Sequence, residues 1–254
     1  MHPSRHRPAR SAALGAIVAL AGCGSPGADP ATGLAPDADG AAPNAAPSSL
    51  PTGLGRHDFE ALTSGALPPG FTPATTLGRP QLAATPATWR LAEGGATATS
   101  SRCLQLAESA NRDEIFNLLL LDAPAPADVA VAVKLRAESG REDRGGGVVW
   151  RVQDAQNYYV ARWNPLEDNV RLYRVVASRR VQLSSAPAKV ARDAWHLLEV
   201  TMIGRVITVR LDGEPKLSLA DQTFRDAGRV GLWTRSDACS AFDDFTVSAA
   251  AASP

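Results

Sequence analysis

GGGVVWRVQDAQNYYVARWNPLEDNVRLYRVV, residues 145–176, is the stretch that decides the fold. It holds all three tyrosines and two of the five tryptophans of a chain in which only 6% of the residues are aromatic. Its pattern predicts three consecutive antiparallel strands at 147–152, 157–163 and 169–176. The polar clusters at 153–156 and 164–168 separate them, because Asn and Asp favour turns and Pro cannot donate to a ladder.

Alternation of side chains divides each of these strands between two faces. We predict that the first face forms the core, with Trp150, Val152, Tyr159, Ala161, Trp163, Val170 and Leu172. The second face carries Val149, Arg151, Tyr158, Val160, Arg162, Arg171 and Tyr173. A fully buried face would not hold three guanidinium groups without partners, so the second face is a candidate ligand surface.

Tyrosine and tryptophan stack on sugar rings, and arginine and asparagine donate to hydroxyl or anionic groups. On this basis the predicted ligand-binding residues are Arg151, Asn157, Tyr158, Arg162, Arg171, Tyr173, Trp233 and Arg235. The alternative is a convex, solvated face on which arginine stems cover the aromatic rings. The sequence does not decide between these two interpretations.

The beginning of the chain is typical of an exported lipoprotein. Residues 1–22 combine an arginine-containing start with the short apolar run 11–20, and LAGC at 20–23 matches the bacterial lipoprotein processing box. We expect Cys23 to carry lipid and to anchor the protein in a bilayer of the bacterial envelope. Gly24 follows in place of the aspartate that would suggest inner-membrane retention, which favours the outer membrane. The alternative is an ordinary secretory signal.

Composition then divides the rest of the chain. Residues 23–55 are rich in Ala, Pro and Gly and contain no aromatic residue, which predicts a disordered linker. One β domain is expected at 56–248, followed by a disordered tail at 249–254. The chain has 26 basic and 26 acidic residues, a balance that gives no support for nucleic-acid binding.

Further strands are predicted throughout the domain. They fall at 89–91, 103–106, 115–121, 128–136, 195–202, 206–211, 216–219, 230–234 and 241–247. Asp212-Gly213 favours a hairpin turn between two of them. Short strands separated by turn signals predict an all-β fold of two antiparallel sheets, a sandwich or a barrel.

The order of motifs resembles the concanavalin A-like lectin/glucanase superfamily, in particular its laminin-G-like and 3-keto-disaccharide hydrolase-like jelly rolls. The motifs are GALPPGF (65–71), GGVVWR (146–151), Asp154 with NYY (157–159), Asp168-Asn169 with Leu172-Tyr173, WH (195–196), Gly228 with GLWT (231–234), and FDDF (242–245). The resemblance implies a jelly-roll β-sandwich whose concave side often binds glycans. It implies no activity by itself.

Signatures of catalysis are missing, so no catalytic residue is predicted. No glutamate has an aspartate two residues later, as the glucanase motif of this superfamily requires, and no Gly-x-Ser-x-Gly occurs. His57 and His196 are the only histidines after the signal, and His196 alternates with apolar residues as a packed histidine would. We therefore expect non-catalytic binding of a carbohydrate or similar polar polymer. A hydrolase with unrecognised residues and a purely structural envelope domain remain alternatives.

Metal ions and disulfides complete the expectations. Asp237, Asp243 and Asp244 could hold a structural Ca²⁺, although no Asp-x-Asp-x-Asp loop is present, and no other cofactor is predicted. Cys103 and Cys239 remain once Cys23 is lipidated, and an exported domain meets an oxidising compartment. The resemblance places the first and last strands side by side, which favours a Cys103–Cys239 disulfide. The alternative is two buried thiols.

Overall fold

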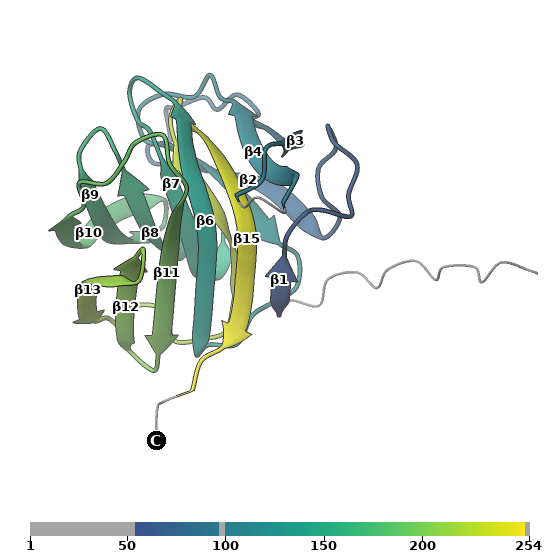
Figure 1. The fold of residues 1–254 in the computed structure, drawn as a ribbon. Coiled ribbons are helices and arrows are strands. Elements are labelled where there is room, and N and C mark those ends of the chain that lie inside the picture. Colours follow the sequence, from purple (N-terminus) through teal and green to yellow (C-terminus); the bar gives the residue numbers. More distant parts are fainter. Residues whose placement is uncertain (1–53, 97–99, 252–254) are drawn as a thin grey trace, which may run out of the picture. The chain divides into compact units, whose positions relative to one another are not determined.

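The fold is an all-β sandwich of two antiparallel sheets. The computed structural model describes residues 54–96 and 100–251, so the predicted signal, Cys23 and nearly all of the predicted linker lie outside the described residues. Sheet A runs in the order β13 (Glu214–Ala220), β12 (Val206–Leu211), β11 (His196–Ile203), β6 (Val129–Ser139), β15 (Cys239–Ala249), β4 (Arg102–Glu108) and β3 (Thr88–Glu93), with β1 (Gly55–His57) paired to β15. Figure 1 shows β11, β6 and β15 side by side.

Sheet B contains the stretch that opened the sequence analysis. Its order is β10 (Arg179–Pro187), β9 (Asn169–Val176), β8 (Asn157–Asn164), β7 (Gly146–Asp154), β14 (Arg229–Arg235), β5 (Ile115–Leu121) and β2 (Phe71–Leu77). The three strands predicted from alternation therefore exist and are neighbours. β10 was not predicted, because its polar sequence lacks apolar alternation.

The predicted core face packs between the sheets, with one exception. Trp150, Trp163 and Tyr159 are fully buried in the core that the two sheets share. Val152 was assigned to this face, and the assignment is wrong. In the pairing of β7 with β14 the register shifts, and Arg151 has a φ of +46°. This β-bulge inserts one extra residue into β7 and so moves Val152 to the opposite face.

The outer face of sheet B is strongly curved. Arg180 on β10 lies with its Cζ 4.9 Å from the ring centroid of Phe116 on β5, although four strands separate β10 from β5. Five steps of about 4.8 Å would put these strands roughly 24 Å apart in a flat sheet. The hydroxyls of Thr76 on β2 and Tyr158 on β8 are likewise only 2.8 Å apart. The sheet therefore curls until its own side chains meet.

A second apolar cluster fills this curve. It consists of Phe116, Leu118, Leu120, Val149, Val152, Tyr158, Val160, Tyr173, Val175 and Trp233. All of these residues are buried, so the face predicted to be a ligand surface is largely an interior. The face is not convex and solvated, as its alternative requires, although an arginine does cover aromatic rings at Arg180 as that alternative also predicts.

The predicted disulfide is wrong, although the strands that carry it are neighbours. Cys103 and Cys239 are free and buried, and β4 pairs with β15. The register sets Phe242 opposite Leu104, which places Cys103 and Cys239 four residues apart along the ladder. That offset corresponds to about 13 Å, beyond the Cα separation that a disulfide spans. Burial raises the pKa of the Cys103 thiol to about 11.

Candidate functional site

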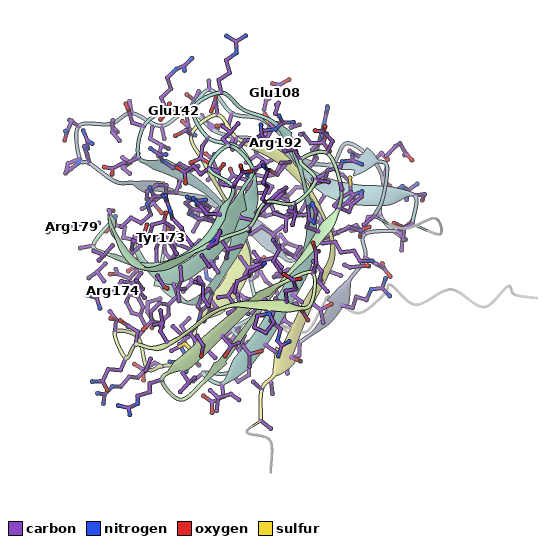
Figure 2. All side chains as sticks on the ribbon, turned by 60° about the vertical axis from the view of Figure 1, so that its left-hand side comes forward. Glu108, Glu142, Tyr173, Arg174, Arg179 and Arg192 are labelled. Carbon is purple, nitrogen blue, oxygen red and sulfur yellow. The ribbon has the colours of Figure 1, made fainter. Side chains whose placement is uncertain are left out.

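Four arginines gather at one end of the curved face of sheet B and define what we call the arginine cluster. They are Arg162 on β8, Arg171 on β9, Arg180 on β10 and Arg235 on β14. Tyr173 on β9 touches three of them, through its ring or its hydroxyl. Figure 2 labels Tyr173 near Arg174 of β9 and Arg179 of β10.

Arg162 and Arg171 stand directly opposite each other in the pairing of β8 with β9. Like charges in such a pair repel. Glu167, in the turn between these strands, lies 2.6 Å from Nη2 of Arg162 and 3.0 Å from Nη1 of Arg171. Burial alone would raise the pKa of Glu167, but the hydrogen bond and charge of Arg162, with help from Arg171, lower it. One carboxylate thus bridges two guanidinium groups.

Arg235 has its own acidic partners. Its Nη1 lies 3.1 Å from Asp143, and its Nη2 lies 3.8 Å from Glu142. Asp143 is buried and also accepts a hydrogen bond of 2.8 Å from the amide of Asn164. Burial raises the pKa of Asp143, while Arg162 and Arg235 oppose that rise. The carboxylate is therefore held in place by neighbours on β8 and β14.

Arg180 differs from the other three arginines because it rests on aromatic rings. Its Cζ lies 4.6 Å from the ring centroid of Tyr173, 4.9 Å from that of Phe116 and 5.9 Å from that of Trp233. Within residues 54–96 and 100–251, Arg180 forms no ion pair. Burial lowers the pKa of its guanidinium, and the nearby arginines add to this effect. Arg180 is therefore a cation held by cation–π contacts alone.

Each arginine of the cluster keeps one buried nitrogen for which the described residues provide no hydrogen-bond partner. These atoms are Nε of Arg162, Nε of Arg171, Nη1 of Arg180 and Nε of Arg235. A buried donor without an acceptor costs about 1–3 kcal/mol. Such atoms are rare in native proteins and call for an explanation, such as a ligand that supplies the acceptor. Arg102 and Arg144 also keep an unpaired Nε, but only the cluster combines four such arginines, which makes it the strongest candidate binding site among the described residues.

Gly147 allows the strands beneath the cluster to approach closely. Gly147 pairs with Trp233 of β14 on one side and with Arg162 of β8 on the other. Residues that pair directly share a face, so Gly147 lies on the curved face at the centre of the cluster. A Cβ at this position would lie 1.9 Å from the carbonyl oxygen of Ala161 and 2.7 Å from Cα of Arg162. Only glycine avoids this contact, and this is how the sequence permits the sharp curvature there.

The structure brings together five of the eight predicted ligand-binding residues. Arg162, Arg171, Tyr173, Trp233 and Arg235 all belong to the cluster or contact it. Arg180 was missed, and the signal that could have found it is the run of two arginines directly after the turn that follows β9.

The other three predicted residues lie elsewhere. Tyr158 is fully buried deeper in the curve, where it bonds with Thr76. Asn157 closes the turn between β7 and β8, since its side chain donates to Asp154 and accepts from the N–H of Ala177. Arg151 turns away at the bulge and belongs to the opposite end of the sandwich. These three residues are not part of the cluster.

Arg151 donates instead to the backbone of three separate segments. Its Nε, Nη1 and Nη2 each lie 2.8 Å from a carbonyl oxygen, of Ala127, Phe224 and Gly204 respectively. Asp128 lies 3.5 Å from Nη2. The guanidinium is buried and has no unpaired nitrogen. Arg151 is therefore a structural clamp.

The carboxylates considered for calcium are engaged with protein donors. Asp237 accepts N–H groups of residues 141–143, and Asp243 accepts the N–H of Ala96 and the hydroxyl of Ser100. Asp244 pairs with Arg56 and Lys134. Within 54–96 and 100–251 no group of three or more His, Cys, Asp or Glu side chains could hold a metal ion.

His196 is a packed histidine, as its alternation predicts. Its Nδ1 lies 2.7 Å from Asp212, its Nε2 lies 2.6 Å from the carbonyl oxygen of Ala191, and its ring meets Trp163 edge-on. Both ring nitrogens are thus occupied. Separately, none of the described segments contains a helix long and apolar enough to span a membrane.

Comparisons with known proteins give the fold a context. No family model matches the chain, and no curated protein matches its sequence. The carbohydrate-binding module CBM66 from Bacillus subtilis shares the fold with 18% identity and a TM-score of 0.54, over 70% of this chain and 94% of that one. Cellulose induced protein, Cip1, shares it with 12% identity and a TM-score of 0.53, over 77% and 97%. These similarities agree with the predicted jelly-roll sandwich, and they concern the fold alone.

Proposed function

We propose that the β-sandwich binds a saccharide without catalysing a reaction on it. The observation that carries this proposal is the arginine cluster, with its four unpaired N–H groups beside aromatic rings. A saccharide offers many hydroxyl acceptors, and the partly exposed guanidinium groups of Arg171 and Arg180 offer the complementary donors. The fold shared with a structure named as a carbohydrate-binding module supports the proposal.

The state of the carboxylates in the cluster supports binding without catalysis. Glu167 and Asp143 both accept hydrogen bonds from arginine, and Glu142 lies beside Arg235. A glycoside hydrolase needs two carboxyl groups that are free to exchange a proton or attack the sugar. Carboxylates already engaged by guanidinium groups are better suited to holding those groups in position.

A glycan array tests the binding. The probe is the full chain with Cys23→Ser, which cannot receive lipid. We expect retention on a limited set of saccharides and at least a tenfold loss of affinity in Arg171→Gln, because Arg171 is half-exposed at the cluster. Arg210→Gln, on β12 of sheet A, is the matched control and should bind as the parent does. Binding to no saccharide on the array would contradict the proposal and favour a structural envelope domain.

The same samples distinguish a lectin from a hydrolase. Each saccharide that binds is incubated with the protein, and the release of new reducing ends is measured. We expect no release above that of the protein-free control. Release that disappears in Asp143→Asn would establish the hydrolase in place of the binding domain.

We also propose that lipid on Cys23 anchors this domain in the outer membrane of a bacterial envelope. The basis is the LAGC box after a short apolar run, and the glycine that follows the cysteine. In membrane fractionation the parent should sediment with outer-membrane markers, and Cys23→Ser should move to the soluble fraction. Unchanged sedimentation of the variant would contradict the lipid anchor.

A further inference from the structure

We propose that the arginine cluster selects a saccharide that carries a negative charge, such as a uronate carboxylate or a sulfate ester, and that Arg180 receives that charge. This inference rests on the proposed function and names its ligand class. The four arginines, their acidic partners and the rings beneath Arg180 carry it.

The charge of the cluster does not balance. Four guanidinium groups face three carboxylates, since Glu167 bridges Arg162 and Arg171 while Glu142 and Asp143 pair with Arg235. Arg180 is the remaining cation. The whole chain carries 26 basic and 26 acidic residues, so this excess is local. One further negative charge, placed at Arg180, would neutralise the cluster.

The environment of Arg180 strengthens this conclusion. Its guanidinium lies on Tyr173, Phe116 and Trp233, with Nη1 buried and unpaired. Burial of a charge without an opposite charge is costly, and arginine cannot relieve that cost by losing its proton. Arg180 is only partly buried, so an anion at the accessible edge of its guanidinium would supply both an acceptor and the missing charge. A hydroxyl group of a neutral sugar would supply only the acceptor.

The other unpaired donors favour an anionic group with several acceptor atoms. Nε of Arg162 and Nε of Arg171 are buried and unpaired on the neighbouring strands β8 and β9. Carboxylate and sulfate groups present two or more oxygens to a guanidinium fork, with hydrogen bonds about twice as strong as those of neutral acceptors. A site built in this way discriminates against the uncharged analogue, whose binding would leave the cation uncompensated.

Calorimetry with matched ligands tests the inference. The protein is the full chain with Cys23→Ser, and the ligands are an oligogalacturonate, its neutral methyl ester, a sulfated oligosaccharide of similar length and sodium sulfate. We expect the oligogalacturonate or the sulfated saccharide to bind at least tenfold more tightly than the methyl ester. Whichever binds identifies the charged group.

Two neighbouring arginines provide the variant and its control. Arg180→Gln keeps a polar side chain but removes the charge, and should weaken the charged saccharide at least tenfold. Arg179→Gln makes the same change one residue earlier on β10, where the side chain is exposed and points to the opposite face. Arg179→Gln should leave the affinity for the charged saccharide within twofold of that of the parent protein. Equal losses in both variants would overturn the role of Arg180.

The remaining outcomes separate this inference from the proposed function. Equal binding of the neutral ester and the charged saccharide would overturn the charge selection and leave saccharide binding intact. Binding of sodium sulfate as tightly as any saccharide would show an anion site without sugar recognition, and would overturn both. Binding of no ligand here, with retention of neutral saccharides on the array, would overturn the inference alone.

Discussion

Arg151 is buried and Arg180 is partly buried in the same sheet, and they differ in what surrounds their guanidinium groups. Arg151 donates to three backbone carbonyl oxygens and lies near Asp128, with every nitrogen satisfied. Arg180 lies on three aromatic rings, has no ion pair within the described ranges and keeps Nη1 unpaired. Arg162 of the cluster is as buried as Arg151 and still keeps Nε unpaired, which teaches that burial alone does not distinguish structural arginines from candidate ligand contacts. The distinction lies in whether the donors are already occupied.

The largest expected effect is on the structural side of this comparison. Arg151→Met should lower the free energy of unfolding by about 3 kcal/mol, because it leaves three carbonyls without their donor and detaches three segments from one another. Urea denaturation followed by tryptophan fluorescence measures the change. A loss below about 1 kcal/mol would show that solvent replaces the guanidinium, and Arg151 would not be a clamp.

Gly147→Ala tests the backbone beneath the cluster and should cost about 2 kcal/mol, within the range for overpacked sites. The added Cβ would collide with the backbone of Ala161 unless β7 and β8 move apart. Gly204→Ala is the matched control for added bulk, because a Cβ there meets nothing within 4 Å, although its φ of +54° carries a strain of its own. If Gly147→Ala is no more costly than the control in urea denaturation, the close approach of these strands is not required.

His57 is a partly buried basic group, and unlike arginine it can lose its proton. Its ring lies 5.4 Å from the ring of Phe71 and 5.9 Å from that of Phe245, by centroids. Burial lowers its pKa, while Asp58 opposes the change. The folded state therefore binds this proton less readily than the unfolded state does.

The stability contributed by neutral His57 is complete above the unfolded pKa of about 6.5 and is lost as the pH falls from there towards the folded pKa. The slope should not exceed about 1.4 kcal/mol per pH unit. Urea midpoints between pH 7.5 and pH 5 should fall in the parent and change less in His57→Gln. Identical pH profiles would show that His57 is not the responsible group.

The smallest expected effect is that of Arg180 on stability without ligand. Because the guanidinium has no ion pair within the described residues, Arg180→Met should change the free energy of unfolding by less than about 1 kcal/mol, and replacement of an unpaired, partly buried charge can be stabilising. Parallel urea denaturation of Arg180→Met and Arg151→Met measures the comparison directly. A loss of about 3 kcal/mol in both variants would erase the distinction between clamp and ligand contact.

Much of sheet B could be predicted from the residues between 145 and 176. Trp150, Tyr159 and Trp163 alternate on one face, and all three are buried in the core between the sheets. Alternation is a local property, so it survives without knowledge of neighbours. The prediction from alternation failed at Val152 because the bulge at Arg151 adds one residue to β7. A bulge is defined by the pairing of two strands, and the sequence of one strand does not show how its neighbour pairs with it.

The candidate site was only partly predictable for a related reason. Arg162, Arg171 and Tyr173 share a face of adjacent strands, and their phase in the sequence groups them correctly. Arg180 comes from a strand without apolar alternation. It joins the aromatic rings of β5 and β14 only because the sheet curls. The disulfide prediction failed similarly, since the pairing of β4 with β15 was expected but its register was not.

The sequence by itself determined that this domain is an all-β sandwich with an aromatic core, because alternation and turn residues act over a few neighbouring positions. It also determined which side chains can donate to a ligand. Only the tertiary structure decided which arginines are satisfied and which are not. That outcome depends on curvature, bulges and register, and these are set by contacts between strands far apart in the chain. Arg151 was expected to contact a ligand and Arg180 was not, and their partners in the fold make the first a clamp and the second a candidate contact for a charged saccharide.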